Sequence, residues 1–225
     1  MFQQTEPRTL VHSAVRLAEL IYHETVRKVR NTHSNAFMAL AVNIMQALIL
    51  VAAFYVMVSV LGLRGAKLRG DFLLYVMSGI FLFITHIKAV GAVAGSETAA
   101  SPMMQHAPMN TIISIMSSAL SALYIQVLSL FIVLFVYHAM VTPFEVAQPV
   151  PAFAMVLLAW GTGCAVGLVF LALKPWFPTF VSMATTIYQR VNMIASGKMF
   201  VANMLPPKLL MMFDWNPLFH AIDQC

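Results

Sequence analysis

Two residues near the end of the sequence have types and spacing that could support chemistry. His220 and Asp223 lie one helical turn apart, an arrangement that suits acid–base catalysis or metal binding. The preceding Asn216 and Pro217 match the cap and the first residue of a helix. Asn accepts a hydrogen bond at a helix start, and Pro loses no needed donor there. We therefore interpret His220 and Asp223 as structural residues of this helix.

Charged residues inside apolar stretches are the second candidates for function. Lys88, close to His86, and Arg190 lie within segments that otherwise read as membrane spans. A charge at that depth costs at least about 2 to 3 kcal/mol, so it normally reaches an interface or lines a polar pathway. Both interpretations stay open for Lys88, whereas the more central Arg190 favours a structural or pathway role. No acidic residue is deeply embedded, so lipid, carbonyl groups, water and an anionic substrate are the candidate partners.

Familiar enzyme signatures are missing from the sequence. It has no GxxxxGK[ST] phosphate loop, no HExxH, no GxSxG and no Cys/His metal spacing. We expect no catalytic residue, no metal site and no cofactor on this chain. If the protein does energy-dependent work, another chain must supply the energy.

The composition indicates the environment of the fold. Of 225 residues, 60% are hydrophobic and only 9% are charged, against roughly a quarter charged in an average soluble domain. So many apolar side chains suit a bilayer rather than water. The net charge of +5 does not indicate nucleic acid, because the bases flank apolar segments and form no contiguous patch. The composition therefore predicts an all-α membrane protein.

The apolar segments are long enough to cross about 30 Å of hydrocarbon as helices. We expect a cytoplasmic N-terminal segment over residues 1–35 and one transmembrane domain over residues 36–225. The domain contains five predicted spans, at residues 36–63, 72–93, 111–139, 152–173 and 179–204. Pro206 and Pro207 end the fifth, because neither can donate a backbone hydrogen bond.

Residues 8–30 are predicted to form an amphipathic helix. One face carries His and charged side chains at steps of three and four, and the other is apolar. This pattern suits a helix lying among lipid headgroups, although an ordinary surface helix packed on a domain is the alternative. The excess of basic residues here puts the N-terminus in the cytoplasm, whereas three basic residues in the 64–70 loop count against that orientation.

Two stretches, GAVAG at 91–95 and GCAVG at 163–167, carry small residues four apart. Such spacing lets helices approach closely. Packing within the chain and association of two copies both remain open.

Several stretches together resemble one family, the permease subunits of ABC-2 type exporters, in the branch that exports capsule and O-antigen polysaccharides. The tail is the most specific part, because it resembles a fifth span, a Pro-containing break, short re-entrant helices and an Asn-Pro-Leu helix start. The family continues through a sixth span, so we expect the chain to be C-terminally truncated. The matching stretches are LAELIYHETVRKVRN, YVMSGIFLFITHIKAV, SPMMQHAPMNTIISIMSSAL, GCAVGLVFLALKPWFPTF and IASGKMFVANMLPPKLLMMFDWNPLFHAIDQ.

The resemblance implies a homodimeric pore in the bacterial inner membrane, assembled with ATP-binding cassette subunits that hold ATP and Mg. Its substrate would be a polysaccharide, lipid-linked or otherwise anchored, passed outward to periplasmic or outer-membrane export components. A drug, another lipid, or a scaffold without transport are the alternatives for the chain's function.

The resemblance also implies roles for residues. Aromatic side chains could stack on sugar rings, and bases could attract an anionic polymer, although aromatic residues are equally typical of membrane interfaces. The predicted substrate pathway comprises Lys88, Arg190, Phe81 and Tyr188; the contact with the ATPase subunit comprises Arg16, Arg27, Lys28, Arg30, Pro102, Gln105 and His106; the outer gate region comprises Pro206, Pro207, Asn216 and Pro217.

Overall fold

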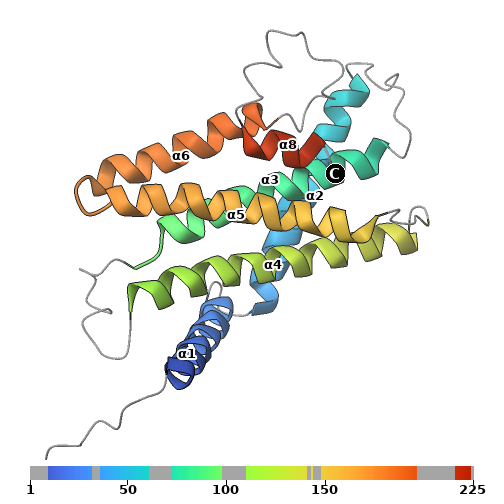
Figure 1. The fold of residues 1–225 in the computed structure, drawn as a ribbon. Coiled ribbons are helices and arrows are strands. Elements are labelled where there is room, and N and C mark those ends of the chain that lie inside the picture. Colours follow the sequence, from blue (N-terminus) through green and yellow to red (C-terminus); the bar gives the residue numbers. More distant parts are fainter. Residues whose placement is uncertain are drawn as a thin grey trace, which may run out of the picture.

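A computed structural model describes residues 10–31, 36–60, 72–97, 110–140, 143, 148–196 and 216–223. All the regular structure within these ranges is helical (Figure 1). This confirms the predicted all-α membrane architecture. The helices are α1 (Leu10–Asn31), α2 (Ala36–Val60), α3 (Phe72–Ala94), α4 (Thr111–Met140), α5 (Pro149–Leu173), α6 (Pro178–Ala195) and α8 (Pro217–Asp223).

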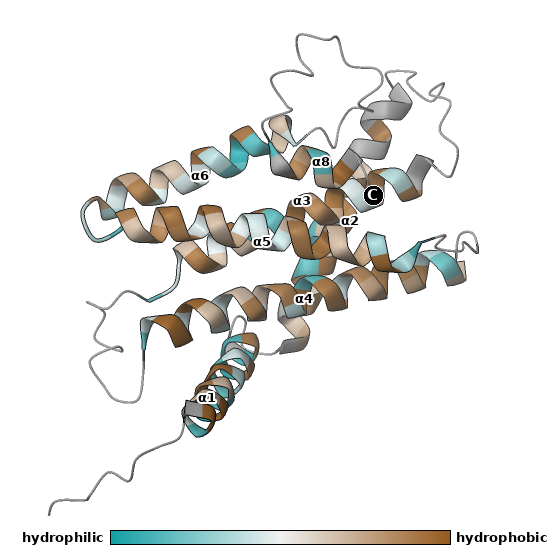
Figure 2. Ribbon diagram, in the orientation of Figure 1, coloured by the Kyte–Doolittle hydropathy of each residue, from teal (hydrophilic) through white to brown (hydrophobic). Residues whose placement is uncertain are grey.

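Three of these helices are long and apolar enough to cross a membrane. They cover Leu74–Ala94 of α3, Thr111–Met140 and Pro149–Leu173, with 21, 30 and 25 residues. A shorter apolar stretch, Leu40–Ala53, lies in α2, and Figure 2 shows α4 and α5 as mostly hydrophobic along their lengths. α6 covers the first part of the predicted fifth span, whose last residues lie outside the described ranges. The first and fifth spans therefore stay predictions.

Helix α3 is the centre of the bundle. Its apolar window is 72% buried, whereas the windows of α4 and α5 are each 28% buried. It packs against α2, α4, α5, α6 and α8, and Val76, Ile80 and Leu82 are almost fully buried. The outward faces of α4 and α5 carry exposed large apolar residues such as Phe131, Phe135 and Val169. Such faces suit contact with lipid rather than with water.

The GCAVG stretch brings α5 into close contact with α3. A Cβ added at Gly163 would lie 2.6 Å from His86 O, and one at Gly167 would lie 2.8 Å from Val93 Cβ. Only glycine leaves room for backbones at this separation. Packing within the chain, one of the two interpretations of this stretch, is therefore confirmed for Gly163 and Gly167.

Three segments meet at one end of the bundle, which we call the α1 end. They are the end of α3, the start of α4, and the turn between α5 and α6. Lys174 Nζ donates to Ala94 O and Ser96 O at 3.4 and 3.3 Å. The backbone N–H of Glu97 donates to Ser114 Oγ at 3.2 Å. These bonds tie the ends of α3 and α5 to the beginning of α4.

Helix α1 lies against α4 at this same end (Figure 1). Lys28 Nζ donates to Ser114 O at 2.8 Å and also reaches the Ser118 hydroxyl. On another face Val11, Val15 and Tyr22 are 73%, 61% and 65% exposed. Packing on the bundle, one of the two interpretations of this helix, is therefore observed for its last turns, and a position among lipid headgroups stays a prediction.

Candidate functional site

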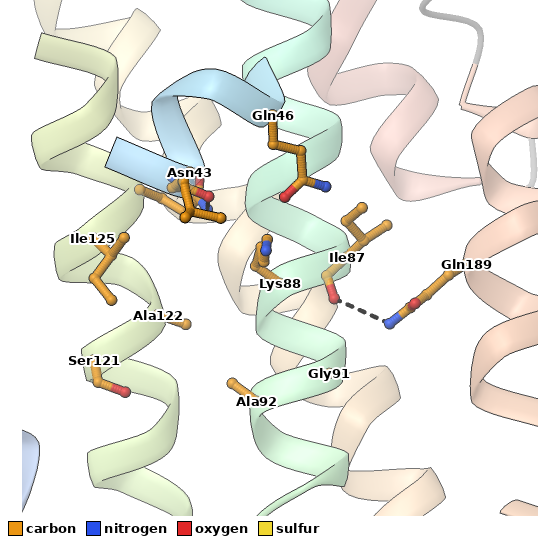
Figure 3. A pocket seen from close by; sticks show the side chains of 12 residues that line it. Asn43, Gln46, Ile87, Lys88, Gly91, Ala92, Ser121, Ala122, Ile125 and Gln189 are labelled. Atoms are coloured by element: carbon orange, nitrogen blue, oxygen red, sulfur yellow. Dashed lines mark hydrogen bonds between the residues drawn. The ribbon is translucent and has the colours of Figure 1, made fainter. Parts of the chain in front are cut away.

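A half-open cavity of about 490 Å³, lined by both polar and apolar residues, lies among α2, α3 and α4, with one lining side chain from α6. Figure 3 shows Lys88 near its centre, with Asn43 and Gln46 on one side and Ser121 and Ile125 on another. Such a cavity is unusual in an apolar bundle, because polar groups there normally bond to one another. Its lining consists of Val42, Asn43, Gln46, Ile87, Lys88, Gly91, Ala92, Ser121, Ala122, Ile125, Gln126 and Gln189.

Lys88 is the charged group of this cavity. It is partly buried, and within the described part of the chain it makes no hydrogen bond or ion pair. An ammonium group at this depth needs water or an anion around it, and the cavity gives it room for either. This arrangement favours a pathway role over simple snorkelling along a lipid-facing surface.

A chain of amides and a hydroxyl group forms one wall of the cavity. Gln126 Nε2 donates to Asn43 Oδ1 at 2.9 Å, and Asn43 Nδ2 donates to Ser129 Oγ at 2.8 Å. Gln126 is 2% exposed, yet its Oε1 atom has no partner among the described residues. A buried acceptor without a partner costs about 1–3 kcal/mol, so we expect a water molecule or a ligand donor to satisfy it.

Gln189 of α6 lines the cavity on the side of α3 that lies away from α4 (Figure 3). Its Nε2 donates to Ile87 O at 3.4 Å, which Figure 3 marks with a dashed line. Gly91 faces this amide, since a Cβ added there would lie 3.4 Å from Gln189 Nε2. Beyond Gln189 lies a second cavity of about 270 Å³, lined by Lys174 and by residues of α3 and α6.

The sequence analysis did not single out Gln126 or Gln189 as site residues. The signal that could have found them is an amide side chain inside an otherwise apolar segment, which is costly unless it is bonded or functional. Asn43 and Gln46 interrupt the first predicted span in the same way.

His86 lies on a different face of α3 from Lys88. It is fully buried, and its Nδ1 lies 3.2 Å from both Ala159 O and Thr162 Oγ1. Its Nε2 lies 2.9 Å from Tyr188 Oη. Both ring nitrogens are therefore bonded, and the imidazole joins α3, α5 and α6. Tyr188, predicted for the substrate pathway, contributes to this joint and does not line the cavity.

The other predicted pathway residues lie elsewhere. Phe81 is 3% exposed and belongs to the hydrophobic core. Arg190 is exposed on α6, next to Gln189 in sequence but outside the lining of either cavity. Of the four predicted pathway residues, the structure brings only Lys88 to the cavity.

The predicted ATPase-contact residues of α1 are at the α1 end. Arg16 and Arg30 are exposed, and Arg27 pairs with Glu24 at 2.7 Å. Burial against α4 lowers the pKa of Lys28, an effect that the nearby Glu24 carboxylate partly offsets. Since Lys28 is occupied with α4, it positions α1. Pro102, Gln105 and His106 lie outside the described residues.

The helix start near the end of the chain matches its prediction. α8 begins at Pro217, and Asn216 Oδ1 accepts a hydrogen bond from Leu218 N at 3.1 Å. Asn216 Nδ2 also donates to Asn192 Oδ1 at 2.7 Å and to Ala195 O at 3.1 Å. The Asn216 cap is thus confirmed, and it also fastens α8 to the end of α6. The remaining outer-gate residues, Pro206 and Pro207, lie outside the described ranges.

Comparison with known proteins gives no match, neither to a protein-family model nor to a curated protein sequence. The resemblance to exporter permeases therefore stays a prediction.

Proposed function

We propose that this chain is the membrane-spanning permease subunit of an ATP-driven exporter. The observation that carries the proposal is the cavity around Lys88: a bundle whose outer faces suit lipid contains a space with a cation that has no bonded partner among the described residues. A purely structural membrane protein gains nothing from such a space, because a buried ammonium group is costly. A protein that moves polar material needs one.

The geometry of the α1 end supports the arrangement of partners. α1 presents exposed bases such as Arg16 and Arg30, and Lys28 links it to the start of α4. A force applied to α1 would therefore reach α4, which forms one wall of the cavity. We place an ATP-binding cassette subunit at this end, on the cytoplasmic side of a bacterial inner membrane, and a second copy of the chain beside the first.

The substrate we propose is a polysaccharide of the capsule or O-antigen type, and this part rests on the resemblance of the quoted stretches. ATP hydrolysis would take place on the cassette subunit. A cation in the path would favour a polymer or carrier with negative charge, because opposite charges attract strongly where water is partly excluded.

The test measures ATP hydrolysis by the complex of the chain with its cassette subunit. If a neighbouring reading frame encodes a cassette subunit, the chain is co-expressed with it, purified as a complex, and reconstituted in vesicles. We expect polysaccharide to stimulate ATP hydrolysis. Lys88→Ala should reduce this stimulation and Lys88→Arg should retain it, whereas Arg190→Ala, outside the lining of either cavity, should leave it unchanged.

Two results would count against the proposal. Failure of the chain to purify with any cassette subunit would remove the exporter assignment. Unchanged stimulation in Lys88→Ala would leave the exporter assignment in place but exclude a pathway role for Lys88.

A further inference from the structure

The two cavities lie one after the other along α3. The larger surrounds Lys88 and the smaller lies at the α1 end beside Lys174. Both linings include Gly91 and Gln189. Among the described residues, Gly91 and Gln189 therefore lie at the boundary where the two half-open spaces adjoin.

A single long hydrogen bond within the described part of the chain holds the Gln189 side chain at this boundary. Its hydrogen bond to Ile87 O is 3.4 Å long, whereas a well-formed N–H···O bond measures about 2.9–3.0 Å. The same Nε2 atom also faces Gly91, one turn further along α3, which has no side chain to hold the amide in place. A rotation of the Gln189 side chain breaks one weak bond and joins the two spaces.

The charges along the two cavities have one sign. Lys174 lies at the first and Lys88 at the second, and neither described lining contains an acidic residue. Lys174 donates to two backbone carbonyls, and an ammonium group has three N–H donors, so one is left for an incoming anion. The amide groups of Asn43, Gln46 and Gln126 surround Lys88 with further polar groups.

From these observations we infer that the two cavities form one access route for an oxyanion group, a phosphate or a carboxylate, and that Gln189 is its gate. The group is attracted by Lys174 at the α1 end, passes Gln189, and binds at Lys88. Phosphate and carboxylate fit because both accept hydrogen bonds from ammonium and amide groups. The direction of passage, from the α1 end inward, rests on the proposed export function; the anion preference and the gate do not.

Thiol labelling tests the route without transport. The native Cys164 and Cys225 are replaced by Ala, and Ala92→Cys puts a thiol in the cavity of Lys88. Membrane vesicles of both orientations receive either 2-sulfonatoethyl methanethiosulfonate, an oxyanion, or its trimethylammonium analogue. Each rate is divided by the reagent's rate with a free thiol in solution, because the reacting thiolate itself attracts the cationic reagent. We expect the normalised rate of the anionic reagent to be about tenfold higher, because a cleft lined by one sign of charge concentrates counter-ions. The faster reaction is expected in vesicles that expose the α1 end.

Variants then separate the roles of the two side chains. Lys88→Gln should abolish the preference for the anionic reagent and Lys88→Arg should keep it. Gln189→Ala should speed labelling by both reagents, and the bulkier Gln189→Phe should slow it. Gln148→Ala is the control, because it removes an exposed amide that belongs to neither cavity lining, and it should leave the labelling rate unchanged.

Protection experiments identify the source of the oxyanion. A short-chain phosphatidic acid and an acidic oligosaccharide are added separately before the reagent. Slower labelling with either supports the inference and names a lipid phosphate or a sugar carboxylate as the ligand. Equal normalised rates for the two reagents, no response to the Gln189 variants, or protection by neither compound would overturn it.

Different results would contradict the proposed function and the anion route. If labelling behaves as described but no cassette subunit associates with the chain, the anion route stands without the exporter. If polysaccharide stimulates ATP hydrolysis while labelling ignores Lys88 and Gln189, the exporter stands without this route.

Discussion

Polar residues on the two sides of α3 have opposite environments. Toward α5, His86 is fully buried and each ring nitrogen has a partner. Toward α2 and α4, Lys88 faces a cavity of about 490 Å³ and makes no bond within the described part of the chain. The residues are two positions apart, so a helix turns them by about 200° relative to each other. A bonded polar group on a close-packed face indicates structure, and an unbonded one in a cavity indicates a ligand.

The largest effect is expected where α5 touches α3. Gly163→Ala would put a Cβ 2.6 Å from His86 O and 2.9 Å from Ala89 Cβ. The helices must separate, and overpacking of this kind lowers the free energy of unfolding by about 1–3 kcal/mol. Thermal unfolding in detergent measures the loss.

Gly161 provides a matched control on the same helix. Nothing lies within 4 Å of a Cβ added there, so Gly161→Ala should keep or raise stability, by about 0.5–1 kcal/mol if α5 gains helix propensity. Equal destabilisation by both substitutions would contradict the close contact between α3 and α5.

A smaller effect is expected at the histidine joint. Tyr188→Phe removes the hydroxyl that lies 2.9 Å from His86 Nε2. It leaves a buried ring nitrogen without a partner, at a cost of about 1 kcal/mol in the free energy of unfolding.

Lys88→Met sharpens the comparison between the two faces. It removes no bond that the described structure contains, so the unfolding midpoint should stay the same or rise, while anion-selective labelling of the cavity is lost. If Lys88→Met destabilises the protein more than Tyr188→Phe, the lysine is a structural residue and the contrast between the faces is wrong.

The smallest effect concerns a lysine that does have partners. Burial lowers the pKa of Lys28 from the usual 10.5, so the unfolded chain binds more protons than the folded one just below that pH. Stability therefore rises with pH over the window between the lowered pKa and 10.5. Above this window both states are neutral at Lys28 and the rise ends.

Lys28→Arg isolates this contribution, because arginine stays charged throughout the window. The difference in unfolding midpoint between wild type and Lys28→Arg should grow as the pH rises from 8 toward about 10. A constant difference over that range would show that Lys28 keeps its ordinary pKa in the folded state.

Several features of the fold could be predicted from the sequence. The scarcity of charge and the lengths of the apolar segments predicted an all-α membrane protein, and three of the segments form long apolar helices. The Asn216 cap and the helix start at Pro217 also agree with the structure. These features are local: they depend on the composition of one segment or on neighbours a few residues away.

The sequence by itself thus indicated that the protein lies in a membrane, where its helices form, and which charged residues are candidates for function. Only the tertiary structure decided which of those charged residues line the cavity. α3 is apolar on nearly all sides, so no polar stripe in its sequence says that Lys88 faces a cavity, that Phe81 lies in the core, or that His86 meets Tyr188. Those outcomes depend on where Gly163 and Gly167 let α5 approach. The amides of Gln126 and Gln189 join the site from α4 and α6 only because the helices pack in this order, which no local pattern encodes.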